Sequence, residues 1–170
     1  MASEPSARPT YRREIRATDP AEIRRIVESS GYFSRAEVEI AIELADERIA
    51  RGDASGYHFL FADGPSGLMG YTCFGPVPAT ESSYDLYWIA VDEPLRGSGL
   101  GRSLLERSER IVEAMGGRRL YIETSSREQY ASTQGFYTRC GYRREAFLEN
   151  FYSEGDGKLI YVKTLGGGRP

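Results

Sequence analysis

The sequence has few of the residues on which metal and nucleophile sites are usually built. Its 170 residues include one histidine, His58, and two cysteines, Cys73 and Cys140, which lack CxxC spacing. A histidine-rich metal centre is therefore excluded, and any Ser-His-Asp or Cys-His arrangement would depend on His58 alone. Two cysteines without that spacing predict reduced thiols in a cytoplasmic protein. We expect no bound metal, and we expect His58 to be an ordinary strand residue.

Long apolar runs and excess positive charge are missing as well. No apolar run approaches the ~20 residues that span a bilayer, and residues 1–5 do not resemble a secretion signal. The net charge is −3 and the isoelectric point is near 5.4. Neutralising nucleic-acid phosphates needs a basic face, so nucleic acid is not expected as the main partner, and neither is a membrane.

The composition is that of a globular protein. Hydrophobic residues make up 40% of the chain and aromatic residues 12%, which is too much for a disordered chain. A length of 170 residues suits one domain that buries a proper core. We expect a single domain over residues 10–165, a disordered tail at 1–9 and a flexible tail at 166–170.

A glycine-rich turn, residues 96–102, is the feature around which the sequence is organised. The apolar run at residues 86–91 predicts a buried strand before it, and the amphipathic pattern of residues 100–115 predicts a helix after it. The first N–H groups of a helix lack internal partners and its dipole is positive there, so this point attracts anions. The glycines let the backbone approach a ligand closely, and Arg96 and Arg102 can pair with phosphate oxygens. The pattern predicts a diphosphate site.

Two common nucleotide motifs do not fit this turn. A Walker loop would end in Gly-Lys-Ser/Thr, which is absent. A dinucleotide fingerprint would need glycine at the position of Arg102, although Glu123 lies about 20 residues on, where a ribose-binding acid is expected. The chain that follows is too short for the second half of a dinucleotide domain. A nicotinamide-dependent enzyme therefore stays a distant alternative.

The spacing that does fit is Arg-x-x-Gly-x-Gly, made here by Arg96, Gly99 and Gly101. In this the sequence resembles the GNAT superfamily of acetyl-CoA-dependent N-acetyltransferases, whose Gln/Arg-x-x-Gly-x-Gly/Ala motif holds the coenzyme A pyrophosphate. A second block, Gly-Phe-Tyr-Thr-Arg-Cys-Gly-Tyr at residues 135–142, is similar to the family's Phe-Tyr-x-x-x-Gly-Phe/Tyr segment. The resemblance covers roughly residues 10–165 and implies acetyl-CoA as co-substrate, with no metal.

The remaining pattern agrees with a mixed α/β fold. The strands expected from alternation and turn signals lie at residues 11–17, 56–62, 68–75, 120–124, 142–151 and 158–165. Helices are expected from Pro20 to about Gly31, from the Ser34–Glu37 capping box to Gly52, and over residues 129–140. The resemblance implies the GNAT-like acyl-CoA N-acyltransferase fold: a mostly antiparallel sheet with a splayed parallel central strand pair and about four helices.

The resemblance also implies which residues hold the co-substrate. The pantetheine arm would run beside the central strand, where a backbone N–H could bind the thioester oxygen, and the turn would hold the pyrophosphate. The positions carried over are Ile89, Ala90, Val91, Arg96, Gly97, Ser98, Gly99, Gly101, Arg102, Thr133 and Phe136. Many family members have Asn and Ala where this chain has Tyr130 and Thr133. We expect coenzyme binding to survive that difference, with the Thr133 hydroxyl near the pantetheine.

Acetyl transfer to an amine needs proton transfers but no covalent enzyme intermediate. The resemblance implies Tyr137 as the acid that protonates the leaving thiolate, and the alternative is that Tyr137 only packs in the core. Asp85 opens the central strand, where a carboxylate among apolar groups should have a raised pKa. Asp85 could be the base, could bind the acceptor's ammonium or could end the strand in solvent. Glu123 is a second candidate base, and water could also deprotonate the amine.

The acceptor is the least determined part of the prediction. Tyr32 and Phe33 either pack a helix corner or, with Tyr130 and Asp85, line the acceptor pocket. These residues suggest a small-molecule primary amine, amino-acid-like or polyamine-like, that is acetylated in a ternary complex. The alternatives are a protein lysine or N-terminus as acceptor, or a non-catalytic coenzyme A-binding sensor. The oligomeric state is left open, with a homodimer as one option.

Overall fold

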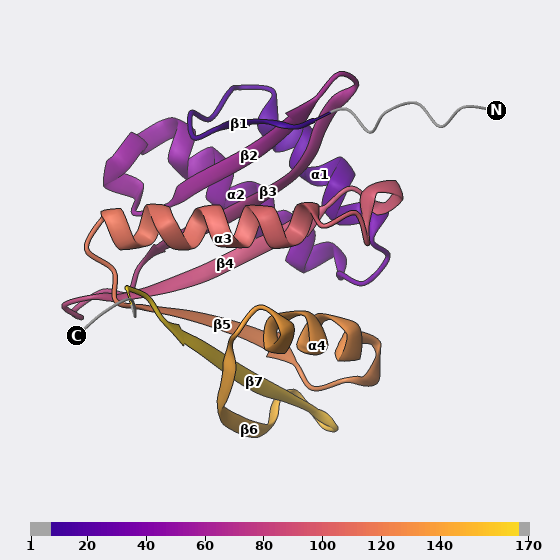
Figure 1. Ribbon diagram of the computed structural model, residues 1–170. Helices are drawn as coiled ribbons and strands as arrows, with labels where there is room; N and C mark the ends of the chain where they lie inside the picture. The colour runs from indigo at the N-terminus through magenta and orange to yellow at the C-terminus, as the bar shows by residue number, and fades with distance from the viewer. Residues whose placement is uncertain (1–7, 167–170) are drawn as a thin grey trace. The chain divides into compact units, whose positions relative to one another are not determined.

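The computed structural model describes residues 8–166 (Figure 1). Residues 1–7 and 167–170, which hold most of the two expected tails, lie outside the described residues. The chain divides into two compact units. The first takes the chain up to Phe74 together with Trp88–Ser108, and the second takes Gly75–Tyr87 together with the chain from Glu109 onward. The expectation of one domain over residues 10–165 stays a prediction.

The first unit combines two helices with strands in the order β1-β2-β3-β4, in which β2 is antiparallel to both β1 and β3. Strand β4 (Ser83–Val91) contributes its second half to this unit, and helix α3 (Leu100–Ala114) its first two turns. The other elements are β1 (Thr10–Arg12), α1 (Asp19–Ser29), α2 (Arg35–Arg51), β2 (His58–Gly64), β3 (Gly67–Pro76) and the short 3-10 turns η1 (Gly52–Ser55) and η2 (Glu93–Leu95).

Helix α2 begins and ends where its sequence signals predict. The Ser34 side chain accepts from the Glu37 N–H at 3.3 Å, and the Glu37 carboxylate accepts from the Ser34 N–H at 2.7 Å. This reciprocal box satisfies two N–H groups that the first turn leaves unpaired. Gly52, with φ of +58°, ends the helix in a conformation that other residues rarely adopt. Both predicted boundaries are confirmed.

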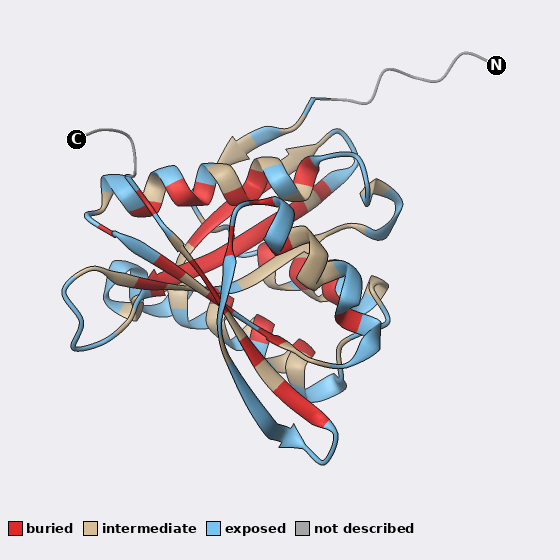
Figure 2. Cartoon of the chain, turned by 60° about the horizontal axis from the view of Figure 1, so that its bottom comes forward, coloured by how far each residue is buried: buried red, intermediate tan, exposed pale blue. Residues whose placement is uncertain are grey.

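The core of the first unit lies between the helices and the strands. The rings of Phe59, Phe61 and Tyr71 stack along β2 and β3 and are almost fully buried. Figure 2 shows buried residues along these strands and on the helices. The helical residues buried against them share a helical spacing of three or four: Ile23, Ile26 and Val27 on α1, and Val38, Ala41 and Ala45 on α2. Burial of these side chains holds the unit together.

The strand expected over residues 11–17 is wrong beyond Arg12. The buried Asp19 carboxylate accepts from the Arg12 guanidinium at 2.7 and 2.8 Å and from the Arg16 N–H at 2.7 Å. These bonds fold the intervening chain into a turn before α1. The alternation of residues 11–17 favours a strand, but the Asp19 carboxylate competes for the Arg16 N–H, and the strand ends at Arg12.

The second unit carries the strand order β4-β5-β7-β6. Strand β4 runs parallel to β5 from Ser83 to Leu86, opposite Arg119–Ile122, and continues to Val91. Strand β7 is antiparallel to both β5 and β6. The other elements are β5 (Arg119–Ser125), η3 (Glu128–Tyr130), α4 (Ala131–Arg139), β6 (Arg143–Ser153), β7 (Asp156–Thr164) and the last part of α3.

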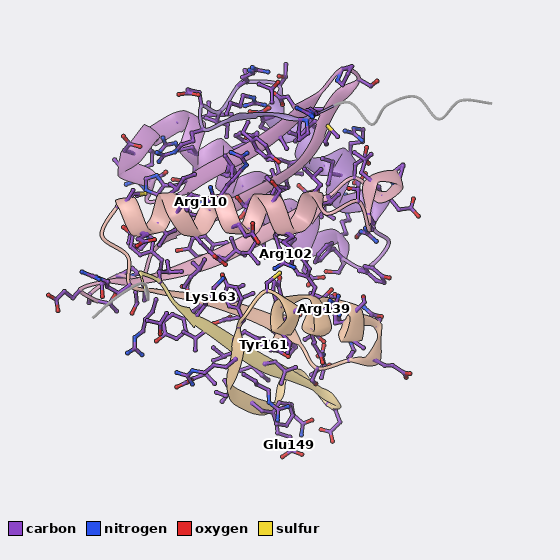
Figure 3. The ribbon with its side chains drawn as sticks, viewed as in Figure 1. Arg102, Arg110, Arg139, Glu149, Tyr161 and Lys163 are labelled. Carbon is purple, nitrogen blue, oxygen red and sulfur yellow. The ribbon has the colours of Figure 1, made fainter. Side chains whose placement is uncertain are left out.

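Glu109 on α3 anchors the second unit internally. Its carboxylate accepts from the Tyr142 hydroxyl at 2.9 Å and from the Lys163 ammonium at 2.8 Å. Lys163 also donates to the Cys140 carbonyl at the end of α4. Figure 3 labels Lys163 on β7. These bonds join α3, the end of α4 and β7 within the unit.

The expected fold class is confirmed. Within residues 8–166 the structure has seven strands, mostly antiparallel with one parallel pair, and four α-helices. The predicted helix at residues 129–140 forms as η3 followed by α4. None of the helices in the described part of the chain has the length and apolar character that crossing a membrane would require.

Candidate active site

The glycine-rich turn joins β4 to α3 in the first unit. Gly97 and Gly99 have φ of +77° and +88°, which side-chain-bearing residues rarely adopt. The Ser98 N–H donates to the Leu95 carbonyl at 3.3 Å, and the Ser103 N–H donates to the Gly99 carbonyl at 3.0 Å as the first bond of α3. The two left-handed glycines therefore turn the chain so that α3 begins directly after the turn.

Several backbone N–H groups in this turn have no acceptor among the residues that the structure describes. Within residues 8–166 the N–H groups of Gly97, Gly99 and Gly101 donate to no other group. A Cβ added at Gly97 or Gly99 would meet no atom within 4 Å, so open space lies beside them. Successive unpaired N–H groups at a helix N-terminus form an anion-binding concavity. The turn therefore fits a diphosphate such as that of coenzyme A.

The two predicted phosphate arginines are on the surface. The Arg96 guanidinium lies over the Tyr32 ring, 5.5 Å from its centroid. Arg102, labelled on α3 in Figure 3, donates to Glu106 at 2.9 Å, one helical turn on, and its side chain is 61% exposed. Exposed pairs of this kind contribute little stability, so Arg102 can exchange Glu106 for an anion at small cost.

The last part of β4, with Ile89, Ala90 and Val91, is half-buried. Strand β3 comes very close to it, because a Cβ added at Gly70 would lie 2.9 Å from the Ala90 carbonyl oxygen. The Asp92 N–H donates to the Met69 carbonyl at 2.9 Å. Gly70 thus permits the close approach of β3 to the strand that leads into the turn.

Tyr32 and Phe33 have different surroundings. The Phe33 ring meets the Trp88 ring edge-on, with 5.0 Å between centroids, and packs against the core of the first unit. Tyr32 is 41% exposed. The packing alternative therefore accounts for Phe33, while Tyr32 presents its ring at the surface beside Arg96.

Tyr137 lies on α4 in the second unit, with its ring buried among three other aromatic rings. The centroids of Phe136, Tyr142 and Tyr161 are 5.5, 6.1 and 5.8 Å away. Burial raises the pKa of Tyr137, and Cys140 and Tyr161 add to the shift. Among the described residues its hydroxyl has no hydrogen-bond partner. A neutral phenol with an uncommitted O–H is the form that can donate a proton.

Asp85 and Glu123 project from neighbouring parallel strands of the second unit. Asp85 is opposite Tyr121 in the β4–β5 ladder, and Glu123 is two residues further along β5, on the same face. Burial raises the pKa of Asp85, the Glu123 charge raises it further, and Lys158 opposes the shift. Lys158 itself pairs with Glu123 at 2.7 Å, which leaves Asp85 as the less neutralised carboxylate.

Comparison with known proteins identifies the chain. The sequence model of the acetyltransferase (GNAT) family matches residues 21–142. The chain belongs to the GNAT acetyltransferase family. A crystal structure from Desulfovibrio desulfuricans, described as that of a candidate GNAT acetyltransferase, shares 47% identity, with a TM-score of 0.90 over 92% of this chain and 98% of that one. No curated protein sequence matches the chain closely enough to count as a relative.

More distant structures share the GNAT fold. An aminoglycoside 6'-N-acetyltransferase complexed with coenzyme A gives a TM-score of 0.74 at 16% identity. The ribosomal-protein-S18-alanine N-acetyltransferase from Escherichia coli gives 0.73 at 18% identity. Each comparison covers 95% of this chain and 99% of the other. Family and fold together support acyltransferase activity with acetyl-CoA, on acceptors that in this family are small molecules or proteins.

The chain departs from the usual GNAT pattern at Tyr130 and Thr133. Tyr130 is buried, with the Arg127 guanidinium 5.8 Å from its ring centroid. Thr133 is half-buried on α4, as is Phe136. Sequence reasoning missed Lys158, which pairs with Glu123. No local signal marks it, because its position depends on the register that sets Lys158 opposite Ser125.

The GNAT chain shows no sign of a metal centre in its described part. No group of three or more His, Cys, Asp or Glu side chains within residues 8–166 is arranged to hold an ion. Cys73 and Cys140 are buried and form no disulfide there. His58, on β2, stacks on Phe74 of β3 with 6.0 Å between ring centroids, as expected for a strand residue.

Proposed function

We propose that this GNAT protein transfers the acetyl group of acetyl-CoA directly to a primary amine of a small cationic molecule, amino-acid-like or polyamine-like, in a ternary complex. The observation that carries the donor side is that the N–H groups of Gly97, Gly99 and Gly101 donate to no group within residues 8–166, with open space beside Gly97 and Gly99 at the start of α3. Family membership supplies the reaction class.

The donor would be held mostly by backbone atoms. The turn from Arg96 to Arg102, including Ser98, would take the diphosphate. The parallel ladder of β4 with β5 stops at Leu86, and the half-buried residues from Ile89 to Val91 follow it. A backbone N–H of this stretch would bind the thioester oxygen, and Thr133 and Phe136 would line the pantetheine. Acetyl-CoA supplies an acyl group that a positioned free amine attacks without an enzyme nucleophile.

Tyr137 is the proposed general acid. Its raised pKa keeps the phenol protonated, and its O–H is uncommitted within the described chain. A donor of this kind can return a proton to a departing thiolate. The ring cluster around Tyr137 fixes the side chain in one orientation, which favours proton transfer at a defined point.

Asp85 is the proposed base or ammonium ligand. Its raised pKa makes it a better proton acceptor than an ordinary surface carboxylate, and Glu123 adds negative charge on the same face. Two carboxylates there favour a cationic acceptor, because they attract an ammonium group. Lys158 neutralises Glu123, so Asp85 is the stronger candidate, with Glu123 or a water molecule as the other sources of the base.

Aromatic surface near this face fits a cationic acceptor as well. The Lys158 ammonium already lies 3.8 Å from the Phe151 ring centroid, which shows that the ring accepts a cation. Phe151 and Tyr152 are about half exposed. An exposed apolar strand would also suit a peptide, so a protein amine is the second candidate acceptor.

A panel of amines tests the proposal, with free thiol release from acetyl-CoA as the readout. The panel contains polyamines, amino acids and aminoglycosides on one side and lysine-containing and N-terminal peptides on the other. Turnover with small cationic amines and none with peptides is expected. Turnover with peptides alone would show that the acceptor is a protein amine and not a small molecule. Acetyl-CoA binding by calorimetry without turnover on either set would make the protein a sensor.

A further inference from the structure

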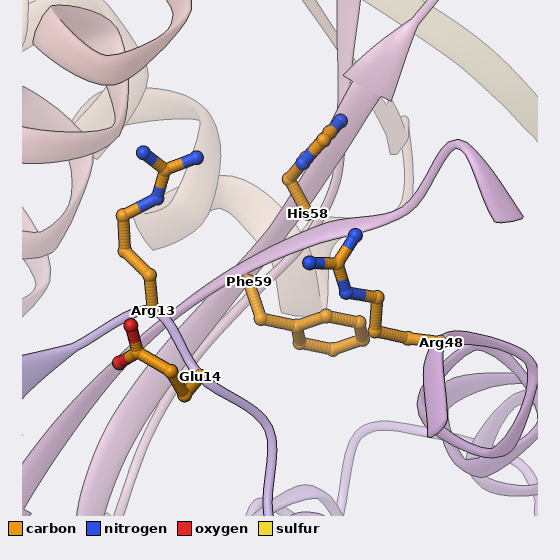
Figure 4. Close-up of a pocket in the computed structure, with 5 residues that line it drawn as sticks. All are labelled: Arg13, Glu14, Arg48, His58 and Phe59. Atoms are coloured by element: carbon orange, nitrogen blue, oxygen red, sulfur yellow. The ribbon is translucent and has the colours of Figure 1, made fainter. Parts of the chain in front are cut away.

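A polar cavity lies in the first unit, lined by none of the residues proposed for acetyl transfer. Its volume is about 180 Å³. Figure 4 shows the lining side chains, which come from three segments: Arg13 and Glu14 after β1, Arg48 on α2, and His58 and Phe59 on β2. One water needs only ~10–15 Å³ of such volume, so the cavity has room for a small ion.

Arg48 brings unused donors to this cavity. Its side chain is only 19% exposed, and its one hydrogen bond within the described chain runs from Nη1 to the Asp53 carboxylate at 2.6 Å. A guanidinium has five N–H donors, so four remain without an acceptor among residues 8–166. Asp53 is 84% exposed and needs only one of them. Pairing with Asp53 therefore does not account for the placement of the whole guanidinium in the cavity wall.

His58 adds a group that can gain a proton. Burial lowers the pKa of its imidazole, and Arg48 and Arg13 lower it further, while Asp53 opposes them. Neither ring nitrogen has a hydrogen-bond partner within residues 8–166. Glu14 is the remaining charged group that lines the cavity. An anion placed among these groups would offset the two guanidinium charges and favour the protonated ring.

We propose that this cavity binds a small oxyanion with a phosphate or carboxylate group. The guanidinium forks of Arg48 and Arg13 match the geometry of both groups, and His58 contributes a third nitrogen from a separate strand. The Glu14 carboxylate accepts hydrogen bonds only, so it favours an anion that also carries a hydroxyl, such as monohydrogen phosphate or a hydroxy acid.

The experiment uses His58 as a local reporter, because it is the only histidine in the chain. The imidazole C2–H resonance is followed by NMR against pH in chloride, in inorganic phosphate and in citrate at equal ionic strength. We expect phosphate, citrate or both to raise the His58 pKa by about one unit, which corresponds to about tenfold tighter binding to the protonated form. A larger shift in phosphate than in citrate indicates a phosphate ligand, and a larger shift in citrate indicates a carboxylate ligand.

Matched variants separate the cavity from general surface charge. Arg48→Gln is expected to weaken the anion response about tenfold or more, since it removes charge-assisted bonds. Arg51→Gln, on the same helix with an exposed i,i+4 pair, should leave the response unchanged. Arg13→Gln is the second test if Arg48→Gln does not fold. A His58 titration that is the same in all three salts, or equal responses in Arg48→Gln and Arg51→Gln, would overturn the proposal.

Discussion

Replacing Gly99 with leucine separates the cost of backbone strain from the loss of acetyl-CoA binding. Gly99 has φ of +88°, and Gly116, after α3, has φ of +92°. An added Cβ meets nothing within 4 Å at either position. Both substitutions therefore carry the same penalty, about 1–2 kcal/mol for a left-handed conformation. Leucine is unbranched at Cβ, so it adds no further backbone restriction of the kind valine would.

The two variants should have the same Tm without ligand but differ in their binding of acetyl-CoA. An unfolding entropy of ~2.1 cal/mol/K per residue gives about 0.36 kcal/mol/K for 170 residues, so the strain lowers Tm by about 3–6 °C in both. Acetyl-CoA at 100 times its Kd stabilises by about 2.7 kcal/mol, which raises Tm by about 7.5 °C. We expect that rise in wild type and Gly116→Leu, and none in Gly99→Leu.

Thermal shift with and without acetyl-CoA provides the assay, and calorimetry measures Kd for each variant. If Gly99→Leu keeps the full acetyl-CoA shift, the turn does not hold the diphosphate and the donor assignment fails. If Gly116→Leu loses the shift as well, the loss reflects general damage. Equal Tm values with unequal ligand shifts are the result that the geometry requires.

Three further changes test other parts of the structure. In steady-state kinetics, Tyr137→Phe should lower kcat by about 10²-fold or more and leave the affinity for acetyl-CoA unchanged. The control Tyr161→Phe, in the same ring cluster, should leave kcat near the wild-type value. In wild type, kcat/KM should fall as the pH drops through the raised pKa of Asp85, so this acidic limb lies above the usual carboxyl range. Asp85→Asn should remove that limb from the pH profile of kcat/KM. Asp19→Asn should cost about 3 kcal/mol in urea unfolding, because the buried Arg12 guanidinium keeps its charge but loses one of its two carboxylate partners. Glu28→Gln at an exposed pair should cost under about 0.5 kcal/mol.

Local signals predicted most of the fold. The capping box at Ser34, the stop at Gly52 and the strand–turn–helix order around residues 96–102 depend on neighbours in the sequence, and the structure has each of them. Strand β1 is shorter than its alternation predicts, because the Asp19 carboxylate accepts the Arg16 N–H and turns the chain before α1. Propensity and alternation carry no information about such a bond.

The candidate site was less accessible to sequence reasoning than the fold. The turn could be recognised because its glycines are contiguous and their spacing is a motif. Lys158 could not be found, since its pairing with Glu123 arises from the β5–β7 register, and the paired sequence positions are far apart. The aromatic cluster around Tyr137 likewise draws rings from α4, the chain after it and β7. Roles assigned to Tyr137 and Asp85 remain predictions for the kinetics to test.

The division of the chain between its two units has a consequence for biosynthesis. The first unit needs Trp88–Ser108 as well as the chain up to Phe74, and Gly75–Tyr87 in between belongs to the other unit. Ribosomal synthesis delivers residues in order, so the first unit lacks its last strand and helix segment until residue 108 has left the exit tunnel. No single cut in the gene yields both units whole, because a cut after Ser108 leaves Gly75–Tyr87 with the first unit and removes it from the second. At least one product of any such cut should therefore be a substrate for proteases rather than a soluble half.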